Sequence, residues 1–378
     1  MISILTYIVK FIPLVISTIV TFVSVFPASE ARLSEEIPEQ VQRIEALEQA
    51  YANGEIAPVD EASFFDGDLN AELEAGIKIN ELNFIATHNS YQSASIDETK
   101  KLYRNLSDLT FGLVSANSGD FANETLTNQL NCGIRSFEID VETFDRDGEI
   151  SFTCMHSPYL EMATTCYDFE LAMKEIVMWS DNNPNHLPIT IIVEPKSVFI
   201  PLEDMEFFNL DYAKALDSTL RETLGEKLFT PADMLRDYAS FGEMRKADDW
   251  CEVKDMLGKV VVLMHECSVT EKYIDIDPSI KSQAMFPMLR YDDIERDCTS
   301  FILANGTKKL IKYQELAAEN KVIMRTLADS YANKSEDEVE LILASRTHII
   351  STDFPPRTDN TADSYVVSFN GKTVRKAN

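Results

Sequence analysis

Short apolar runs rich in β-branched residues recur along most of the chain, and they constrain its fold more than any other feature. Eight such runs stand out, at 82–87, 134–141, 149–156, 187–196, 259–266, 321–327, 347–354 and 364–369. Most of them are bounded by Pro, Gly, Asn or Asp, as strands commonly are. Helix-like segments at 168–183, 210–225 and 336–345 separate several of these predicted strands.

Strands that alternate with helices indicate a parallel sheet, and this number of units favours a closed barrel over an open sheet. We therefore predict an α/β fold of the TIM (β/α)8 type. The chain has no internal repeat, and it has neither a GxGxxG motif nor a P-loop that would indicate a nucleotide-binding fold. With 378 residues, 45% of them hydrophobic, it can bury a sizeable core.

The N-terminus has the pattern of an export signal. Its first 31 residues are apolar, and Lys10 and Glu30 are the only charged residues among them. Ser29 and Ala31 fit the small-x-small rule, so we predict a signal peptide at 1–31 that is cleaved near Ala31, and a secreted or periplasmic protein. The alternative is an uncleaved membrane anchor, because the apolar stretch approaches the roughly 20 residues that span a bilayer.

Residues 32–75 are predicted to form an N-terminal helical extension. The apolar side chains of Val41, Ile44, Leu47 and Tyr51 recur three or four positions apart, which describes one amphipathic helix. Gly54 and Pro58 would end this helix. The barrel itself is expected to occupy residues 76–378.

The charge balance makes one large class of partner improbable. The chain has 63 acidic and 34 basic residues, a formal net charge of −29. Binding to a nucleic acid depends on Lys and Arg displacing counterions from phosphates, so we expect no nucleic-acid partner. The same charge weakens docking on anionic lipid, and only transient contact with a membrane surface is expected. We expect a monomer whose acidity suits the binding of a divalent cation.

Six cysteines show neither a CxxC pair nor the spacing of a zinc site. They are Cys132, Cys154, Cys166, Cys251, Cys267 and Cys298. In an exported protein they could form up to three disulfides, and Cys154 with Cys166 or Cys251 with Cys267 would close short loops. Free, buried cysteines are the alternative, and sequence alone does not determine the pairing.

The run GIRSFEIDV, at 133–141, carries two carboxylates where a buried parallel strand is normally apolar on both faces. Glu138 and Asp140 are two positions apart and project from one face, while Phe137 and Ile139 occupy the other. Two carboxylates held together repel each other, and a cation between them removes the repulsion. Calcium, which accepts about six to eight oxygen ligands, suits such a site.

Two further oxygen ligands are predicted at neighbouring strand ends. Asn89 follows the first strand and offers an amide oxygen, and Glu194 lies at the end of LPITIIVE. Barrel enzymes place their chemistry at the C-terminal ends of the strands, where Asn89, Glu138, Asp140 and Glu194 would meet. We therefore predict that these four residues hold calcium.

Two histidines, His88 and His156, lie at or near strand ends of the same barrel face. Imidazoles with pKa values near neutrality can act as acid and base across a phosphate while a cation polarises the phosphoryl oxygens. The set predicts metal-assisted phosphodiester chemistry in which His88 contacts the phosphate. Most histidines at strand ends are packed or surface residues, and we interpret His186, His265 and His348 in that way.

A structural role is the alternative for the charged residues. Glu138 and Asp140 could form ion pairs with Arg135 or Lys196 instead of holding a cation. Lys196 and Arg325 could likewise be solvated strand ends.

Six motifs occur in a specific order along the chain. They are THNSY (87–91), GIRSFEIDV (133–141), MHSP (155–158), NHLPITIIVEPK (185–196), MRTLADS (324–330) and ASRTHIISTDFPP (344–356). Together they resemble the calcium-dependent phosphatidylinositol-specific phospholipase C family, which belongs to the PLC-like phosphodiesterase superfamily. The resemblance spans roughly residues 76–376. Each motif is weak alone, whereas their order and spacing make the set fairly specific.

The resemblance implies a distorted TIM barrel that cleaves a phosphodiester on the diacylglycerol side of the phosphate. In that family the inositol 2-hydroxyl attacks phosphorus and yields a cyclic inositol phosphate, which water can open later. At the matching positions, His88 would stabilise the pentacovalent phosphate and His156 would protonate the leaving alcohol. The residues expected to hold Ca²⁺ are Asn89, Glu138, Asp140 and Glu194, one of whose carboxylates could serve as the base.

The resemblance also suggests substrate contacts. Lys196 and Arg325 would contact the substrate phosphate or the inositol hydroxyls. Asp329 and Asp353 lie in family-like stretches, but no role is assigned to them. The chain shows no pleckstrin-homology, EF-hand or C2 module and no obvious basic ridge, so we expect membrane targeting to come from another feature.

Two other functions compete with this prediction. A glycerophosphodiester phosphodiesterase would use its two histidines in the same way, but that family usually has His-Arg-Gly after its first strand and an Asp after its second histidine. This chain has His-Asn-Ser at 88–90 and Ser157 after His156. The second alternative is a catalytically silent, calcium-dependent protein that binds an inositol or sugar headgroup, and the intact histidine pair argues against it.

Overall fold

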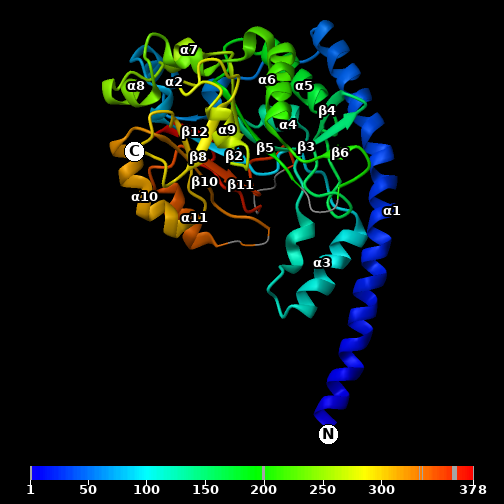
Figure 1. Ribbon diagram of the computed structural model, residues 1–378. Coiled ribbons are helices and arrows are strands. Elements are labelled where there is room, and N and C mark those ends of the chain that lie inside the picture. Colours follow the sequence, from blue (N-terminus) through cyan, green and yellow to red (C-terminus); the bar gives the residue numbers. More distant parts are fainter. Residues whose placement is uncertain (1, 198–200, 332, 334, 360–363, 378) are drawn as a thin grey trace.

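Eight parallel strands close into a barrel at the centre of the molecule (Figure 1). The computed structural model describes residues 2–197, 201–331, 333, 335–359 and 364–377, with side chains from residue 12 onward. The barrel strands are β2 (Leu82–Thr87), β3 (Ser136–Arg146), β5 (Ile189–Pro195), β7 (Val260–His265), β8 (Phe286–Arg290), β9 (Phe301–Leu303), β10 (Ile323–Leu327) and β11 (Ile349–Thr352). They pair in the order β2-β11-β10-β9-β8-β7-β5-β3, and a β2–β3 pairing at Thr87 and Phe137 closes the ring.

The predicted TIM-type α/β barrel is therefore confirmed, and it is distorted. The β8–β9 connection, residues 291–300, contains turns and bends instead of a helix. A short antiparallel strand, β12 (Val374–Lys376), pairs with β2 outside the ring and in turn with β1 (Phe65–Asp66). The remaining short strands, β4 (Glu149–Thr153) and β6 (Met205–Glu206), pair with the end of β3 that extends beyond the barrel.

Helices cover the outside of the barrel. The α-helices after the first are α2 (Leu69–Glu74), α3 (Asp97–Leu109), α4 (Leu126–Asn131), α5 (Phe169–Asn182), α6 (Leu210–Leu224), α7 (Pro231–Leu235), α8 (Phe241–Ala247), α9 (Thr270–Ile274), α10 (Thr307–Glu319) and α11 (Glu336–Leu343). Short 3₁₀ helices are η1 (Glu61–Phe64), η2 (Ile79–Glu81), η3 (Ala116–Asp120), η4 (Gly225–Lys227) and η5 (Val253–Met256).

The helix α5 illustrates why these segments are helical. The Asp168 side chain caps its N-terminus by accepting a hydrogen bond from the Leu171 amide at 2.9 Å. Phe169, Met173 and Ile176 recur at helical spacing and are fully buried against the barrel. All three helix-like segments of the sequence, at 168–183, 210–225 and 336–345, are helices in the structure, as α5, α6 and α11.

Two apolar clusters divide the core along the pleat of the strands. Alternate residues of β5, such as Ile191 and Val193, join a cluster that packs the outer faces of the strands against the helices. Ile192, which points the other way, joins a second cluster that fills the barrel lumen together with Phe286 and Phe301. The outer faces of β5 and β7 are thus apolar, whereas the lumen contains both apolar and polar side chains.

Two of the eight predicted strands are wrong as barrel strands. The run 149–156 forms β4, which pairs antiparallel with β3 through a hairpin whose two turn residues, Asp147 and Gly148, both have positive φ. The run 364–369 is not a strand: its Val367 amide donates to the Phe354 carbonyl at 2.8 Å, and Phe369 forms an isolated bridge with Lys372. The position beside β2 is occupied by β12. Val367 and Phe369 instead pack into the outer core.

The two barrel strands that were not predicted are β8 and β9. The strand β8 contains Pro287, which lowers its strand propensity, and β9 has only three residues, Phe301–Leu303.

All six cysteines lie within the described residues and are free. The four that are buried, among them Cys154 and Cys166, behave as small apolar residues of the core.

The first helix, α1 (Ile2–Ala52), runs along one flank of the barrel and continues beyond it past α3 (Figure 1). Its C-terminal half is tied to the barrel, since the Gln40 side chain exchanges hydrogen bonds with the backbone of Asp168 at 2.9 and 2.8 Å. Arg43 pairs with the buried Glu175 at 3.2 Å. The predicted amphipathic helix is thus the last part of α1, while the boundaries predicted at residues 31 and 75 stay predictions.

Part of α1 has the composition of a membrane span. The segment Ile12–Ala52 includes a window with a mean hydropathy of 1.9. Apolar side chains such as Ile19 and Val23 are exposed on it, at 58% and 68%. This long apolar helix is compatible with a signal peptide or with an anchor.

Replacing Ile191 by Ala tests the outer core. Ile191 is fully buried between β5 and the helices, so the substitution removes apolar contacts and leaves a cavity. We expect a loss of about 3 kcal/mol in the free energy of unfolding, measured by urea titration. Ile150→Ala on β4 is the control, because Ile150 is 37% exposed and its truncation should change stability by well under about 1 kcal/mol. Equal losses in the two variants would contradict this packing.

Candidate active site

The strand β3 presents three carboxylates on its inward face. Glu138, Asp140 and Glu142 alternate with apolar residues that join the outer core, and the three are between 0% and 3% exposed. The sequence predicted the first two as cation ligands and missed Glu142. The alternation that identified Glu138 and Asp140 extends to Glu142, so the same sequence pattern could have identified this third carboxylate.

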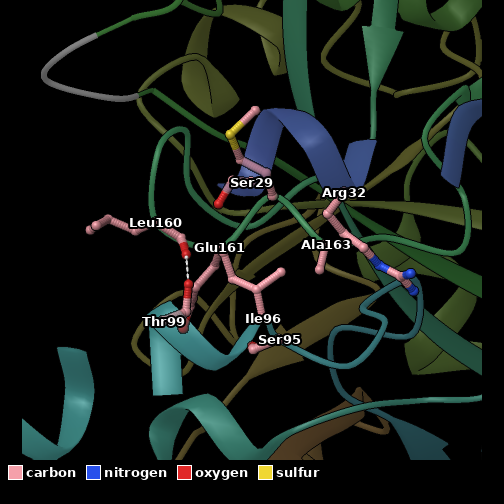
Figure 2. Close-up of a pocket in the computed structure, with 9 residues that line it drawn as sticks. Ser29, Arg32, Ser95, Ile96, Thr99, Leu160, Glu161 and Ala163 are labelled. Carbon is pink, nitrogen blue, oxygen red and sulfur yellow. Dashed lines mark hydrogen bonds between the residues drawn. The ribbon is translucent and has the colours of Figure 1, made fainter. Parts of the chain in front are cut away.

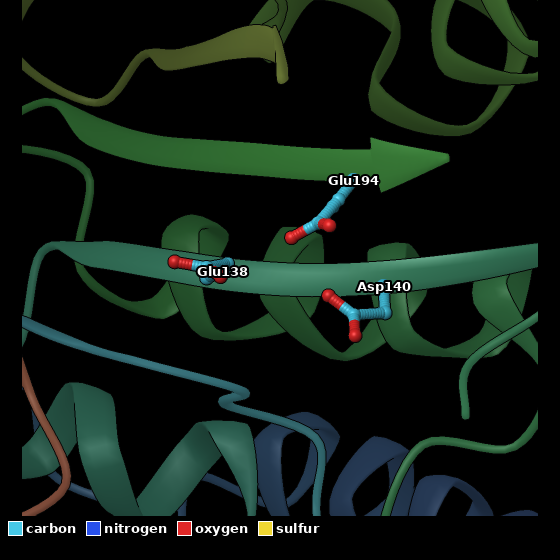
Figure 3. Close-up of side chains that lie close together, drawn as sticks. All are labelled: Glu138, Asp140 and Glu194. Carbon is cyan, nitrogen blue, oxygen red and sulfur yellow. The ribbon is translucent and has the colours of Figure 1, made fainter. Parts of the chain in front are cut away.

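Glu194 on the neighbouring strand completes a compact acidic group. The register pairs Asp140 with Glu194, so both side chains project from the same level of the barrel wall. One carboxylate oxygen from each of Glu138, Asp140 and Glu194 lies within 4.8 Å of the others. Figure 3 shows how the three side chains lie on the two neighbouring strands. Three of the four predicted calcium ligands therefore lie together at the C-terminal mouth of the barrel.

Lys196 lies within this acidic group. Its Nζ is 2.8 Å from Asp140 Oδ2 and 2.8 Å from Glu194 Oε1. Burial alone would lower the pKa of Lys196, but the two carboxylates outweigh burial and raise it above its ordinary value. The Tyr91 hydroxyl donates a further hydrogen bond to Asp140 Oδ2 at 2.9 Å. The lysine is a partner of the predicted ligands and not a solvated strand end.

Arg325 on β10 neutralises Glu138 from across the lumen. It is only 2% exposed, and its guanidinium donates to Glu138 Oε2, to Ser351 Oγ at 3.0 Å and to Asn305 Oδ1 at 2.8 Å. Burial would raise the pKa of Glu138, but Arg325 and then His88 outweigh it and lower the pKa to about 2. Glu138 is therefore ionised at neutral pH.

His88 follows β2 and lies between two carboxylates. Its Nδ1 is 2.7 Å from Asp353 Oδ1, at the end of β11, and its Nε2 is 3.8 Å from Glu138 Oε1. Burial would lower the pKa of His88, but Glu138 and Asp353 raise it to about 9. At neutral pH the imidazole is therefore a cation. Asp353, to which the sequence assigned no role, fixes the ring through Nδ1.

Asn89 lies beside His88 in a tight turn. Its φ of 43° is in the left-handed region, which Asn tolerates better than most residues. The turn is held by Asn123, whose side-chain amide donates to the carbonyls of His88 and Asn89 at 3.0 and 3.1 Å. The next amide, of Ser90, donates to the Glu138 carbonyl at 2.8 Å, which places the turn against β3. Asn89 thus lies next to the acidic group and is buried.

His156, in the loop after β4, has its own carboxylate partner. Its Nδ1 contacts Glu161 Oε2, and Glu161 also accepts a hydrogen bond of 2.5 Å from the Tyr103 hydroxyl on α3. Burial would lower the pKa of His156, but the hydrogen bond and charge of Glu161 raise it above the ordinary value. Asp140 is near enough to raise it further. Nothing in the sequence pattern singled out Glu161, because it lies in an irregular loop.

The loop that carries Glu161 is held between α1 and α3. The Thr99 hydroxyl on α3 donates to the Leu160 carbonyl at 2.8 Å (Figure 2). A small pocket beside this contact is lined by residues of all three segments, among them Ser29 and Arg32 of α1, Thr99 of α3 and Glu161 of the loop. The N-terminal helix therefore helps to position the carboxylate that holds His156.

The other histidines divide into two kinds. His186 and His348 are packed residues, as predicted, since burial lowers the pKa of each to about 4. His265 ends β7 at the barrel mouth and is half-buried. Its charge helps to lower the pKa of Glu138, so it lies near the acidic group. It was interpreted as a packed or surface residue and is better described as part of the mouth.

The predicted ion-pair alternative is confirmed for Lys196 and wrong for Arg135. Arg135 turns away from Glu138 and Asp140 and pairs with Glu61 on η1, beneath the ring of Trp179. Lys196 does pair with Asp140, and Arg325 pairs with Glu138. Charged and imidazole side chains from several strands and loops nevertheless converge on one mouth of the barrel, which a set of unrelated structural ion pairs would not require. They are Glu138, Asp140, Glu194, His88, His156, Lys196 and Arg325.

A model of the calcium-dependent phosphoinositide phospholipase C family matches residues 142–378, more than half of the chain. The chain belongs to this family. The matched residues include His156, Glu194, Lys196 and Arg325. His88 and three of the predicted calcium ligands, Asn89, Glu138 and Asp140, precede the matched range.

Solved structures of a bacterial phospholipase C have the same fold. The calcium-dependent phosphoinositol-specific phospholipase C of a Gram-negative bacterium, Pseudomonas sp., in its apo form is 18% identical, with 84% of this chain and 100% of that chain covered and a TM-score of 0.56. The same values hold for that enzyme in its myo-inositol complex. A Ca²⁺-dependent phosphatidylinositol-specific phospholipase C from Streptomyces antibioticus is 15% identical, with 73% and 95% covered and a TM-score of 0.48. The curated proteins contain no match.

The acidic group suits the calcium on which the phospholipase C family depends. Among the described residues, Asp140 Oδ1 has no hydrogen-bond partner although the residue is fully buried. Burial raises the pKa of Asp140, and the Lys196 ammonium only partly opposes this effect. A buried carboxylate oxygen without a partner is unfavourable, and carboxylate oxygens are the ligands that calcium prefers. The residues of this chain therefore fit the ion.

A pH titration tests the packed role of His186. Its Nε2 is 2.8 Å from Ser180 Oγ and its pKa is about 4 in the folded protein, below the ordinary 6.5. The unfolded chain therefore binds the proton more readily, and the stability that neutral His186 contributes is complete above pH 6.5 and is lost as the pH falls toward 4. Between pH 7 and 4.5, wild type should lose about 2–3 kcal/mol more unfolding free energy than His186→Gln. Parallel losses would contradict this role.

Proposed function

We propose that this protein is a calcium-dependent phosphodiesterase that cleaves phosphatidylinositol-type lipids into diacylglycerol and an inositol phosphate, cyclic or opened. The observation that carries the proposal is the meeting of a three-carboxylate group with two imidazoles, each backed by its own carboxylate, at one mouth of the barrel. An acid, a cation beside the phosphate and a metal site are the parts that phosphodiester cleavage needs.

The carboxylates and Asn89 would hold the ion. Glu138, Asp140 and Glu194 lie within 4.8 Å of one another, and Asn89 in the adjacent turn adds an amide oxygen. Calcium bound there would polarise the phosphoryl oxygens and favour ionisation of the attacking hydroxyl. Arg325, whose guanidinium is buried and bonded to Glu138, would keep that carboxylate ionised and oriented. Its contacts favour this role over the substrate binding expected from the sequence.

The two imidazoles would have different roles, and one carboxylate of the acidic group would accept the proton that the inositol 2-hydroxyl loses as it attacks. His88, with a pKa of about 9, is cationic at neutral pH and suits the negative charge that grows on the phosphate as the inositol 2-hydroxyl attacks. His156, whose pKa is raised by Glu161, carries the proton that the diacylglycerol alkoxide needs as the phosphorus–oxygen bond breaks. Asp353 and Glu161 are positioning residues, since each holds one ring through its Nδ1.

The remaining parts of the proposal concern substrate and location. Lys196 lies at the rim of the acidic group with 19% of its side chain exposed, and its bonds to Asp140 and Glu194 favour a role beside these carboxylates over the substrate contact expected from the sequence. We infer export of the protein, with the apolar half of α1 serving as a signal peptide or an anchor. Glycerophosphodiester cleavage is the second candidate activity, because the same two imidazoles would serve it equally well.

Turnover of a chromogenic inositol phosphodiester, measured with calcium and with a chelator, tests the proposed function. We expect product formation with calcium and a rate at least about 10² lower after chelation, since the ion contributes several kcal/mol of charge stabilisation. A glycerophosphodiester assayed in parallel identifies the second candidate. Calcium-dependent affinity for inositol without product from either substrate would instead indicate a silent binding protein.

Replacing His156 by Ala separates acid catalysis from ion binding. We expect kcat to fall by about 10² or more with calcium affinity unchanged, because the leaving alcohol loses its proton donor. Asp140→Asn should show the opposite pattern and weaken calcium binding first. Ser157→Ala, in the same loop, is the matched control and should retain the wild-type rate. Full activity of the His156 variant would remove this residue from the mechanism.

A further inference from the structure

Glu142 is a buried carboxylate that the proposed mechanism does not use. It is fully buried, and neither of its carboxylate oxygens has a hydrogen-bond partner among the described residues. Burial raises the pKa of Glu142 to about 8, which favours its protonated form at neutral pH, and an ionised Glu142 would need a positive partner at this buried position. Glu138 forms an ion pair with Arg325 and Asp140 forms one with Lys196, whereas Glu142 forms an ion pair with neither of these cations.

Lys196 is the nearest basic side chain that could become that partner. In the β3–β5 register Asp140 lies opposite Glu194 and Val141 opposite Pro195, and the Lys196 amide donates to the Val141 carbonyl at 2.9 Å. One step farther along these strands, Glu142 and Lys196 are therefore neighbours that project from the same face. Among the charges that favour ionisation of Glu142, that of Lys196 is the strongest.

The present position of Lys196 conflicts with a bound cation. Its ammonium lies 2.8 Å from Asp140 and 2.8 Å from Glu194, two of the three carboxylates of the proposed calcium site. A divalent ion on those carboxylates would repel an ammonium bonded to the same groups. The lysine side chain is long and flexible, so a rotation of its stem can move the charge without moving the strand.

We propose that Glu142 is a positioning residue of the cation site, which receives the Lys196 ammonium when calcium binds to Asp140 and Glu194. The inference rests on the proposed calcium site and adds a counter-ion exchange to it. Without calcium, Lys196 compensates the paired carboxylates. With calcium, the ion compensates them and Lys196 compensates Glu142, so every buried carboxylate of β3 has a positive partner.

A direct metal ligand is the competing role for Glu142. The carboxylate oxygens of Glu138, Asp140 and Glu194 approach one another within 4.8 Å, and Glu142 is not part of this group. It lies two residues beyond Asp140, in the part of β3 that pairs with β4. Its position beside Lys196, outside the acidic group, favours the exchange.

A double-mutant cycle in the full chain tests the exchange by calcium titration calorimetry. Lys196→Met should bind calcium more tightly than wild type, because the competing ammonium is gone. Glu142→Gln should bind it about tenfold more weakly, because the displaced ammonium has no acceptor. In the Lys196→Met background, Glu142→Gln should change the affinity by less than about twofold, since the two effects are coupled. Glu149→Gln, an exposed change of the same charge on the hairpin, is the control.

Thermal unfolding without calcium gives an independent measurement. Glu142→Gln should not lower the apo melting temperature, because the carboxylate has no partner in that state. A lowered apo melting temperature would assign Glu142 a purely structural role and overturn the proposal. Equal weakening of calcium binding by Glu142→Gln with and without Lys196 would identify a direct ligand instead. A wild-type protein that binds no calcium would overturn both the cation site and the exchange, whereas calcium binding with an additive cycle would overturn the exchange alone.

Discussion

The compensation of buried negative charge on β3 is the interaction on which the active-site mouth depends. Glu138, Asp140 and Glu142 are almost inaccessible to solvent, and a buried carboxylate is tolerated only when it is paired or protonated or binds a metal. The protein supplies Arg325 from the far side of the lumen and Lys196 from the adjacent strand. Arg325, together with His88, keeps Glu138 ionised, whereas Lys196 only partly offsets the effect of burial on the pKa of Asp140. The fold around these groups sets where a metal can enter.

The same principle operates around the imidazoles with the signs reversed. Burial would lower the pKa of His88 and of His156, and carboxylates outweigh it: Glu138 and Asp353 raise the pKa of His88, and Glu161 and Asp140 raise that of His156. Asp353 comes from a segment far along the chain and Glu161 from an irregular loop, so the charged state of each histidine is a property of the assembled barrel. The long helix α1 and the inserted helix α3 belong to this arrangement, because they hold the loop that carries Glu161 (Figure 2).

Much of the fold and part of the site could be predicted from local patterns. Six of the eight barrel strands and three of the helices follow from runs of apolar residues, because their periodicity depends only on neighbouring positions. The local sequence signal is too weak for β8, which contains a proline, and for β9, which has three residues. The Asp147–Gly148 turn, which makes β4 part of a hairpin, was not recognised in the sequence. Glu138 and Asp140 were identifiable because charges on an apolar strand violate its pattern.

The sequence by itself determined which side chains of β3 share a face, because the pleat alternates with a period of two, and it determined that His88, Asn89 and Glu194 lie at strand ends. Only the tertiary structure decided their partners: Asp353 for His88, Glu161 for His156, Arg325 for Glu138 and Lys196 for Asp140. The reason is physical. Ring closure and loop packing join residues separated by up to 265 positions, and no local periodicity encodes such a contact.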